Sequence, residues 1–313
     1  MHKRRRFSHP LLPGMTIGLI APSSPVFEAD RRDAAVRLLE DMGFAVRRGQ
    51  SVDALSYCFS GTDEVRASDV IDMFADPEVD AVVCLRGGYG ATRILDRIDW
   101  QRLSCHPKPF VGFSDITSLH VALQKHCGFI TFHGPMPGVM EPIGLRDELS
   151  RAQWLSVLAG DSGRQVQNPD GTLFQGNHRG TVVGRLIGGN LSVLCSLIGT
   201  RHEPDWDQAL LLLEDVSERT ARLDSMVQQL ESHGVFTRIA GLVLGDFSHY
   251  EGQTNPHKVP MEEIFPPHTP SELPVLWGLH AGHGRDRMTL ALNARYRMDT
   301  DHATLTLLEP VFR

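Results

Sequence analysis

Cysteine is scarce in this 313-residue sequence, and long apolar runs are missing. The five cysteines form no C-x-x-C pair, so they indicate neither a disulfide framework nor a zinc site; they are Cys58, Cys84, Cys105, Cys127 and Cys195. No stretch approaches the roughly 18 consecutive apolar residues of a membrane-spanning helix. We therefore expect a protein of a reducing compartment, the cytoplasm, with no membrane partner.

Positive charge is also limited. Lys and Arg number 31 against 38 Asp and Glu, which gives a formal net charge of −7. Nucleic-acid binding usually requires a basic face, so no nucleic-acid partner is expected. The contents of 41% hydrophobic and 22% charged residues are ordinary for a soluble globular protein, and the length suffices for two domains.

The first half of the sequence alternates short apolar runs with helical patterns. The apolar runs read as buried strands and lie at 15–22, 45–48, 80–88, 109–113 and 128–134. The helical patterns lie between them, at 28–44, 63–76, 91–98 and 116–126. Such alternation predicts right-handed βαβ units around a parallel sheet, so residues 1–145 are expected to form an α/β domain.

The second half follows a stretch with little apolar periodicity. We interpret residues 146–178, which contain one helical pattern, as an interdomain segment. Residues 179–313 again alternate apolar runs with helices, and the runs at 289–299 and 303–310 alternate apolar with polar residues. That alternation is typical of antiparallel strands with one solvated face. A smaller mixed α/β domain is predicted.

The run GFSDITS, residues 112–118, places Ser114 between an apolar strand and a helix. The serine could cap the helix by accepting a hydrogen bond from a first-turn N–H. Alternatively, it could be a nucleophile on a sharp strand-to-helix turn. Ile116 replaces the final glycine of the G-x-S-x-G pattern, so an ordinary α/β-hydrolase is not favoured.

A second run, LRGGYG at 85–90, follows a buried strand. Paired glycines at the carboxyl end of a strand let the backbone approach a ligand closely, although they could equally form a simple tight turn. The run is neither G-x-G-x-x-G nor a phosphate-binding loop, so no cofactor is predicted.

Two further runs offer paired candidates. In LLLLEDVSE, Glu214 or Asp215 could orient an imidazole, or could form a salt bridge or a helix cap instead. In LHAGHGRDRMTL, His280 and His283 are three residues apart, but Gly282 and Gly284 break any helix here and no third ligand lies at a recognisable spacing. No metal site is therefore predicted, and the histidine between two glycines is expected to be exposed on a loop.

Eight runs occur in the order seen in the LD-carboxypeptidases, a family of serine peptidases. They are IAPSSP, GTDEVRASDV, LRGGYGATRIL, FVGFSDIT, FHGPM, GRLIGGNLSVL, LLLEDVSERTARLDSMVQQL and PVLWGLHAGHG. The resemblance covers about residues 11–300. It implies a Rossmann-like amino-terminal domain and a smaller, swivelling β/β/α carboxyl-terminal domain.

The resemblance also implies roles for individual residues. Ser114 would be the nucleophile, His283 rather than His280 its base, and Glu214 the carboxylate that orients the histidine. The backbone N–H groups of Gly88 and Asp115 would form the oxyanion hole.

The implied activity is hydrolysis of an L,D peptide bond with release of a C-terminal D-amino acid, as in murein tetrapeptide recycling. The substrate would be a small peptide with free carboxylates, for which Arg86 is a candidate partner, although a structural ion pair would explain Arg86 equally well. A homodimer is possible. One alternative keeps the three residues but hydrolyses a peptidyl-nucleotide, as the microcin-C immunity peptidases do. Another is a non-catalytic, two-lobed binding protein in which Ser114 only caps a helix.

The sequence departs from the family pattern in two places. Thr220 and Ala221 lie where a Gly-Glu-x-x-Tyr stretch is usual, and Arg285 and Asp286 replace a Pro-Asn pair. The loop at 248–262 would supply an aromatic platform for a nucleotide base, and it offers only Tyr250, which favours murein peptides.

Overall fold

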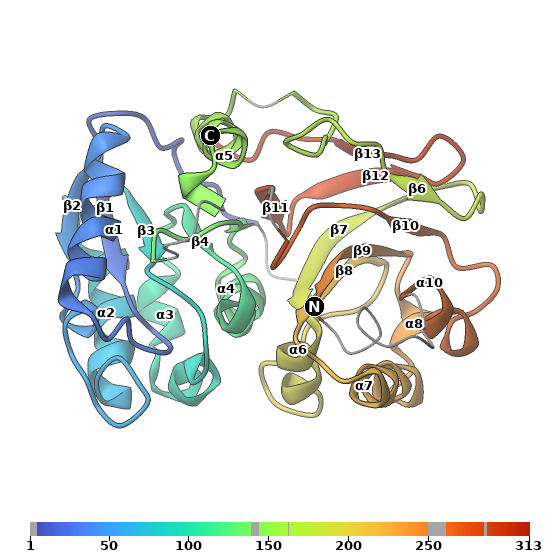
Figure 1. Ribbon diagram of the computed structural model, residues 1–313, viewed down its shortest axis with the longest axis horizontal. Helices are drawn as coiled ribbons and strands as arrows, with labels where there is room; N and C mark the ends of the chain where they lie inside the picture. The colour runs from blue at the N-terminus through green and yellow to red at the C-terminus, as the bar shows by residue number, and fades with distance from the viewer. Residues whose placement is uncertain (1–4, 139–143, 162, 250–260, 285–286) are drawn as a thin grey trace.

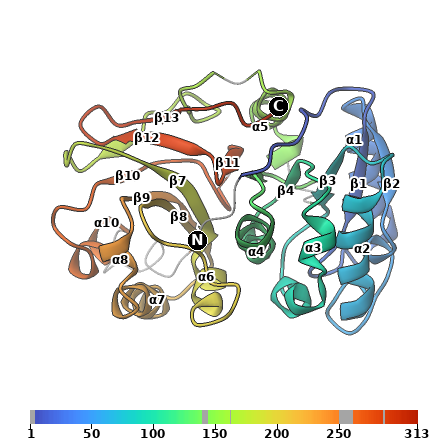
Figure 2. The same cartoon turned by 180° about the vertical axis from the view of Figure 1, so that it is seen from behind.

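Two β-sheets, one centred on each half of the chain, organise the protein (Figure 1). The computed structural model describes residues 5–138, 144–161, 163–249, 261–284 and 287–313. Figure 2 shows from behind that the two sheets and their helices lie side by side, with α5 between them at one edge. The predicted α/β class, with a parallel amino-terminal sheet and a second mixed domain, is confirmed.

The first sheet has the strand order β2-β1-β3-β4-β5-β11. Its parallel strands are β1 (Thr16–Ile20), β2 (Ala45–Arg48), β3 (Ala81–Cys84), β4 (Phe110–Gly112) and β5 (Thr131–His133). The last strand, β11 (Leu290–Leu292), comes from the far end of the chain and pairs antiparallel with β5. The order reverses between β1 and β3, and open sheets of this kind bind ligands beside the strand ends at such a reversal.

Helices connect the strands of the first sheet at the predicted places. They are α1 (Ala29–Asp41), η1 (Gln50–Val52), α2 (Asp63–Ala75), η2 (Ala91–Arg97), α3 (Trp100–Leu103), η3 (Ser114–Ile116) and α4 (Thr117–Cys127). The helix expected at 91–98 is the 3-10 helix η2. The hydroxyl of Thr62 caps α2 by accepting a hydrogen bond from the N–H of Val65, which begins the helix directly after a loop.

The second sheet has seven strands in the order β13-β12-β7-β8-β9-β10-β6. Its parallel centre is β7 (Thr181–Asn190), β8 (Ala209–Val216), β9 (Gly241–Ser248) and β10 (Val275–Trp277). Antiparallel strands flank the centre: β6 (Gln175–Gly176), β12 (Arg295–Asp299) and β13 (Thr304–Leu307). The run ALLLLED of β8 is buried throughout, as expected for a parallel strand covered on both faces.

The helices of the second half are α6 (Leu191–Leu197), α7 (Thr220–Ser232), α8 (Val235–Arg238), α10 (Met261–Ile264) and η5 (Pro266–His268). Figure 1 shows α6, α7 and α8 along one side of the second sheet. The segment between the sheets contains η4 (Gly144–Arg146) and α5 (Glu148–Ala159). The interdomain segment also supplies β6 to the second sheet, while β11 from the second half joins the first sheet.

The two halves meet where β7 ends against the start of α4. The N–H of Asn190 donates to Thr117 Oγ1 at 3.0 Å. Gly189 has φ +134°, and a Cβ at this position would lie 2.5 Å from Thr117 Oγ1. Only glycine fits this approach without displacing α4.

We expect Gly189→Ala to lower the free energy of unfolding by about 2 to 4 kcal/mol, because alanine disfavours this φ and its methyl group overlaps Thr117. Urea denaturation followed by circular dichroism measures the change. Gly163→Ala is the matched control, since a Cβ at Gly163 meets nothing within 4 Å. Equal stability of the two variants would contradict the importance of this contact.

Candidate active site

Ser114 lies at the turn between β4 and α4 with φ +65°. A positive φ is rare for a residue with a side chain and is found where surrounding structure imposes it. The N-cap positions of η3 and α4 are Phe113 and Ile116, and neither helix start has a side-chain cap. The capping interpretation of Ser114 is therefore wrong, and the serine occupies the strained turn of the alternative interpretation.

His283 and Glu214 come from the second half and meet Ser114 across the seam between the sheets. His283 Nε2 lies 3.1 Å from Ser114 Oγ, and His283 Nδ1 lies 2.7 Å from Glu214 Oε2. Glu214, near the end of β8, is fully buried. A carboxylate that accepts from Nδ1–H leaves Nε2 free to accept a proton from the serine hydroxyl.

The glycine before His283 lets its loop come close to the carboxylate. Gly282 has φ +124°, and a Cβ there would lie 2.5 Å from Glu214 Oε2. On the opposite side, the ring of Phe113 lies 4.9 Å from the imidazole, measured between ring centroids. The imidazole is thus held between the carboxylate and a ring from the first half.

Asp215 and His280, the other members of the two candidate pairs, contact different groups. Asp215 accepts hydrogen bonds from Asn190 Nδ2 and from the N–H of Ser192 at the start of α6, and burial raises its pKa to about 6. His280 Nε2 lies 3.3 Å from Thr172 Oγ1 in the interdomain segment. The structure therefore brings together Ser114, His283 and Glu214.

The two backbone N–H groups expected to form the oxyanion hole belong to the loop after β3 and to the residue that follows Ser114. Gly87 packs against Ser114, since a Cβ on this glycine would lie 3.1 Å from Ser114 Oγ, and Gly88 follows it on an exposed turn. Within the described residues, neither the N–H of Gly88 nor that of Asp115 donates a hydrogen bond to another protein group. Both remain available to a bound group.

Arg86 donates to the backbone carbonyls of Gly87 and Pro25 at 3.2 and 3.3 Å. Its described partners are therefore neutral carbonyls of the neighbouring loops rather than an acidic side chain. Thr220 and Ala221 are the first two residues of α7. Tyr250 and the pair Arg285–Asp286 lie outside the described residues.

Asp246, on β9, was not predicted from the sequence. Its N–H donates to the carbonyl of Ala281 at 2.8 Å, and its Oδ2 accepts from the N–H of Gly284 at 3.2 Å. Asp246 thus holds both sides of the loop that carries His283. The sequence signal for Asp246 was the run LGDF. In this run, as in LLED, an acidic residue lies near the end of an apolar strand.

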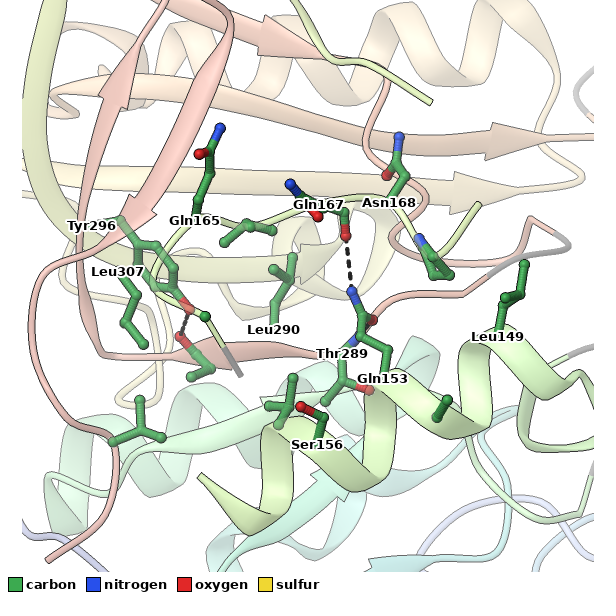
Figure 3. A pocket seen from close by; sticks show the side chains of 17 residues that line it. Leu149, Gln153, Ser156, Gln165, Gln167, Asn168, Thr289, Leu290, Tyr296 and Leu307 are labelled. Atoms are coloured by element: carbon green, nitrogen blue, oxygen red, sulfur yellow. Dashed lines mark hydrogen bonds between the residues drawn. The ribbon is translucent and has the colours of Figure 1, made fainter. Parts of the chain in front are cut away.

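A cavity of about 390 Å³ lies apart from these residues, between α5, residues 163–169 and the strands β11 to β13 (Figure 3). Gln153, Leu290 and Tyr296 are among its lining residues, whereas Ser114, Glu214 and His283 are not. Among the described residues, no group of three or more His, Cys, Asp or Glu side chains is arranged to hold a metal ion. No helix in the described ranges is long and apolar enough to cross a membrane.

Comparison with known families identifies the class of protein that this fold and site define. Residues 17–134 match the LD-carboxypeptidase N-terminal domain, and residues 183–298 match the LD-carboxypeptidase C-terminal domain. These matches assign the protein to the peptidases, which are hydrolases. More particularly, the chain belongs to the LD-carboxypeptidase family, as the sequence motifs predicted.

Individual relatives cover most of the chain. The probable murein peptide carboxypeptidase of Bacillus subtilis is 34% identical over 299 residues, which span 94% of this chain and 92% of that protein. The murein tetrapeptide carboxypeptidase of Pseudomonas aeruginosa is 34% identical over 276 residues, spanning 86% and 88%. The solved apo structure of the wild-type microcin C7 self-immunity protein has a TM-score of 0.90 and 24% identity, covering 98% of this chain and 100% of that chain. This last likeness shows the fold alone.

The raised pKa of the Asp246 carboxyl group can be tested through the pH dependence of the free energy of unfolding. Burial is the main cause that raises its pKa from 3.8 to about 6. The folded chain therefore binds a proton here more tightly than the unfolded chain, and the resulting stabilisation is lost as the pH rises through this window.

Relative to Asp246→Asn, we expect the native chain to lose up to about 3 kcal/mol of unfolding free energy between about pH 4 and about pH 7. Urea titrations of both proteins at each pH measure the difference. The variant Asp41→Asn, at an exposed position at the end of α1, controls for the change in net charge. A difference that does not depend on pH would contradict the raised pKa.

Proposed function

We propose that this protein is a serine-type LD-carboxypeptidase in which Ser114, His283 and Glu214 act as a catalytic triad. The observation that carries the proposal is the continuous pair of contacts from Ser114 Oγ to His283 Nε2 and from His283 Nδ1 to Glu214 Oε2. A protein that only binds a ligand has no need of this arrangement, nor of the positive φ at Ser114.

The proposed reaction has two stages. His283 takes the proton of the Ser114 hydroxyl as the oxygen attacks the peptide carbonyl, and it then gives that proton to the leaving amine. The released product is the terminal D-amino acid. Water, activated by the same imidazole, hydrolyses the acyl-serine and restores the enzyme. Glu214 holds the imidazole tautomer and stabilises the imidazolium formed in each stage.

The tetrahedral intermediate of each stage carries a negative oxygen. We assign its stabilisation to the N–H groups of Gly88 and Asp115, which lack internal acceptors in the described structure. Such donors contribute about 3 kcal/mol each to transition-state stabilisation. Arg86, on the same loop as Gly88, is proposed to attract a substrate carboxylate.

The proposed substrate is a murein tetrapeptide, cleaved at the bond between its L-configured centre and the terminal D-amino acid. Support comes from the names of the two relatives at 34% identity, both murein peptide carboxypeptidases. The five free cysteines are consistent with the cytoplasm as the place of action. A homodimer is part of this proposal and no cofactor is required.

Substitutions within the triad test the mechanism. We expect Ser114→Ala, His283→Ala and Glu214→Gln each to lower kcat by about a thousandfold or more. Because the three act as one unit, the double variant Glu214→Gln/His283→Ala should be little slower than the slower single variant. Steady-state release of the D-amino acid gives the rates.

The controls are His280→Ala and Asp215→Asn, which lie beside the triad in sequence but contact other groups. Both should keep substantial activity when compared at matched thermal stability. An inactive His280→Ala together with an active His283→Ala would show that the assigned base is wrong.

A second experiment tests the substrate. The protein is incubated with a disaccharide tetrapeptide ending in a D-residue, with its diastereomer ending in an L-residue, and with a peptidyl-adenylate analogue, and mass spectrometry follows each. We expect cleavage of the first compound only. Selective cleavage of the peptidyl-adenylate would reassign the protein to the immunity peptidases while leaving the triad intact.

A further inference from the structure

Two serines of the IAPSSP run have no part in the proposed reaction, yet they contact both loops that surround Ser114. Ser23 and Ser24 follow β1, on the edge of the first sheet where the loops after β3 and β4 also lie. We propose that Ser23 and Ser24 are positioning residues that fix the two N–H groups of the oxyanion hole. This inference rests on the proposed function.

Ser24 holds the turn that carries Gly88. Its Oγ accepts a hydrogen bond from the N–H of Tyr89 at 3.0 Å. Its side chain also packs on the neighbouring residue, because a Cβ on Gly88 would lie 2.4 Å from Ser24 Oγ. The hydrogen bond fixes the peptide plane between Gly88 and Tyr89, and the close contact restricts Gly88 itself, so the adjoining plane that presents the Gly88 N–H is restrained through this residue.

Ser23 positions the second N–H group, that of Asp115, by binding the Asp115 side chain. Its hydroxyl, fully buried, donates to Asp115 Oδ2, and that oxygen also accepts from the N–H of Ala91 at 2.8 Å. The Asp115 carboxylate is therefore tied to the loops after β1 and β3, and its N–H belongs to the residue directly after Ser114. The strand β3 separates β1 from β4 in the sheet, so this carboxylate connects loops whose strands are not neighbours.

A buried arginine from the GTDEVRASDV run links the loop after β1 to the loop after β3. Arg66, fully buried on α2, donates from Nη1 to the carbonyl of Pro22 at 2.7 Å and to that of Gly90 at 2.8 Å. The carbonyl of Pro22 comes directly before the serine pair, and the carbonyl of Gly90 follows the Gly88 turn. Four of the sequence runs, IAPSSP, GTDEVRASDV, LRGGYGATRIL and FVGFSDIT, therefore contribute to the placement of two N–H groups.

The consequence for the reaction is specific. The carbonyl oxygen of the substrate carries little charge in the bound state and a full charge in the tetrahedral intermediate. A misplaced N–H donor therefore costs more in the transition state than in the ground state, which lowers kcat while KM changes little. A general weakening of the fold would also lower the apparent kcat at unchanged KM, because fewer molecules are active, so kcat is calculated per active site and the hydrogen-exchange readout below separates the two causes.

The test compares Ser24→Ala and Ser23→Ala with Ser60→Ala. Ser60 is also fully buried, and its backbone N–H bonds to the carbonyl of Ser23, but its Oγ has no partner among the described residues. We expect each of the first two variants to lower kcat about tenfold to a hundredfold with KM changed less than about threefold. Ser60→Ala should retain both constants.

Amide hydrogen exchange gives a second readout that does not depend on catalysis. In Ser24→Ala, exchange at Tyr89 should accelerate at least about tenfold, because its N–H loses its acceptor, while Ser60→Ala leaves it unchanged. Unchanged exchange at Tyr89, or a kcat for both serine variants equal to that of Ser60→Ala, would overturn the inference. A native protein that releases no D-amino acid would refute the proposed function instead, and the exchange result would still decide whether Ser24 fixes the turn.

Discussion

The candidate site depends on one hydrogen bond at the seam between the two halves. Asn190 donates its N–H to Thr117 Oγ1, and Thr117 lies three residues after Ser114 on the same turn and helix. Asn190 is also the register partner of Glu214 in the parallel pair β7 and β8. This contact therefore links the strand next to the one that presents the carboxylate to the helix that follows the serine. The close approach at Gly189 makes this contact possible, because any side chain there would push β7 away from α4.

The site gathers three carboxyl groups near the seam. Glu214 and Asp215, near the end of β8, are buried, and Asp246, near the end of β9, is partly buried. Burial raises the pKa of each of these two aspartates to about 6, which shows how poorly the surroundings accept a carboxylate charge. In the proposed reaction, attack by the serine hydroxyl places a proton on His283, and the carboxylate of Glu214, 2.7 Å from His283 Nδ1, would stabilise the resulting imidazolium.

Local sequence patterns predicted the strands and helices well because those patterns arise from neighbouring residues. The apolar runs and the helices between them indicated the parallel sheet, and the alternation of side chains along a strand separates Glu214 from Asp215. Excluding a helix cap at Ser114 needed the backbone, since a positive φ leaves no mark in the sequence. The return of β11 to the first sheet, the seam at Gly189 and the support from Asp246 join residues that are far apart in the chain. No periodicity or spacing records such contacts, so only the folded structure displays them.

The division of the site between the sheets also separates its chemical tasks. The first half supplies the serine together with the loops after β1 and β3, and these elements surround the position of the carbonyl oxygen. The second half supplies His283 and Glu214, which in the proposed reaction would transfer the proton. A change that moves one half relative to the other therefore lengthens the contact between Ser114 Oγ and His283 Nε2 without altering the N–H groups around the carbonyl. Proton transfer tolerates such lengthening poorly because a hydrogen bond weakens steeply beyond about 3.2 Å. The seam is thus the part of the fold on which proton transfer depends most, although neither Asn190 nor Thr117 takes part in that transfer.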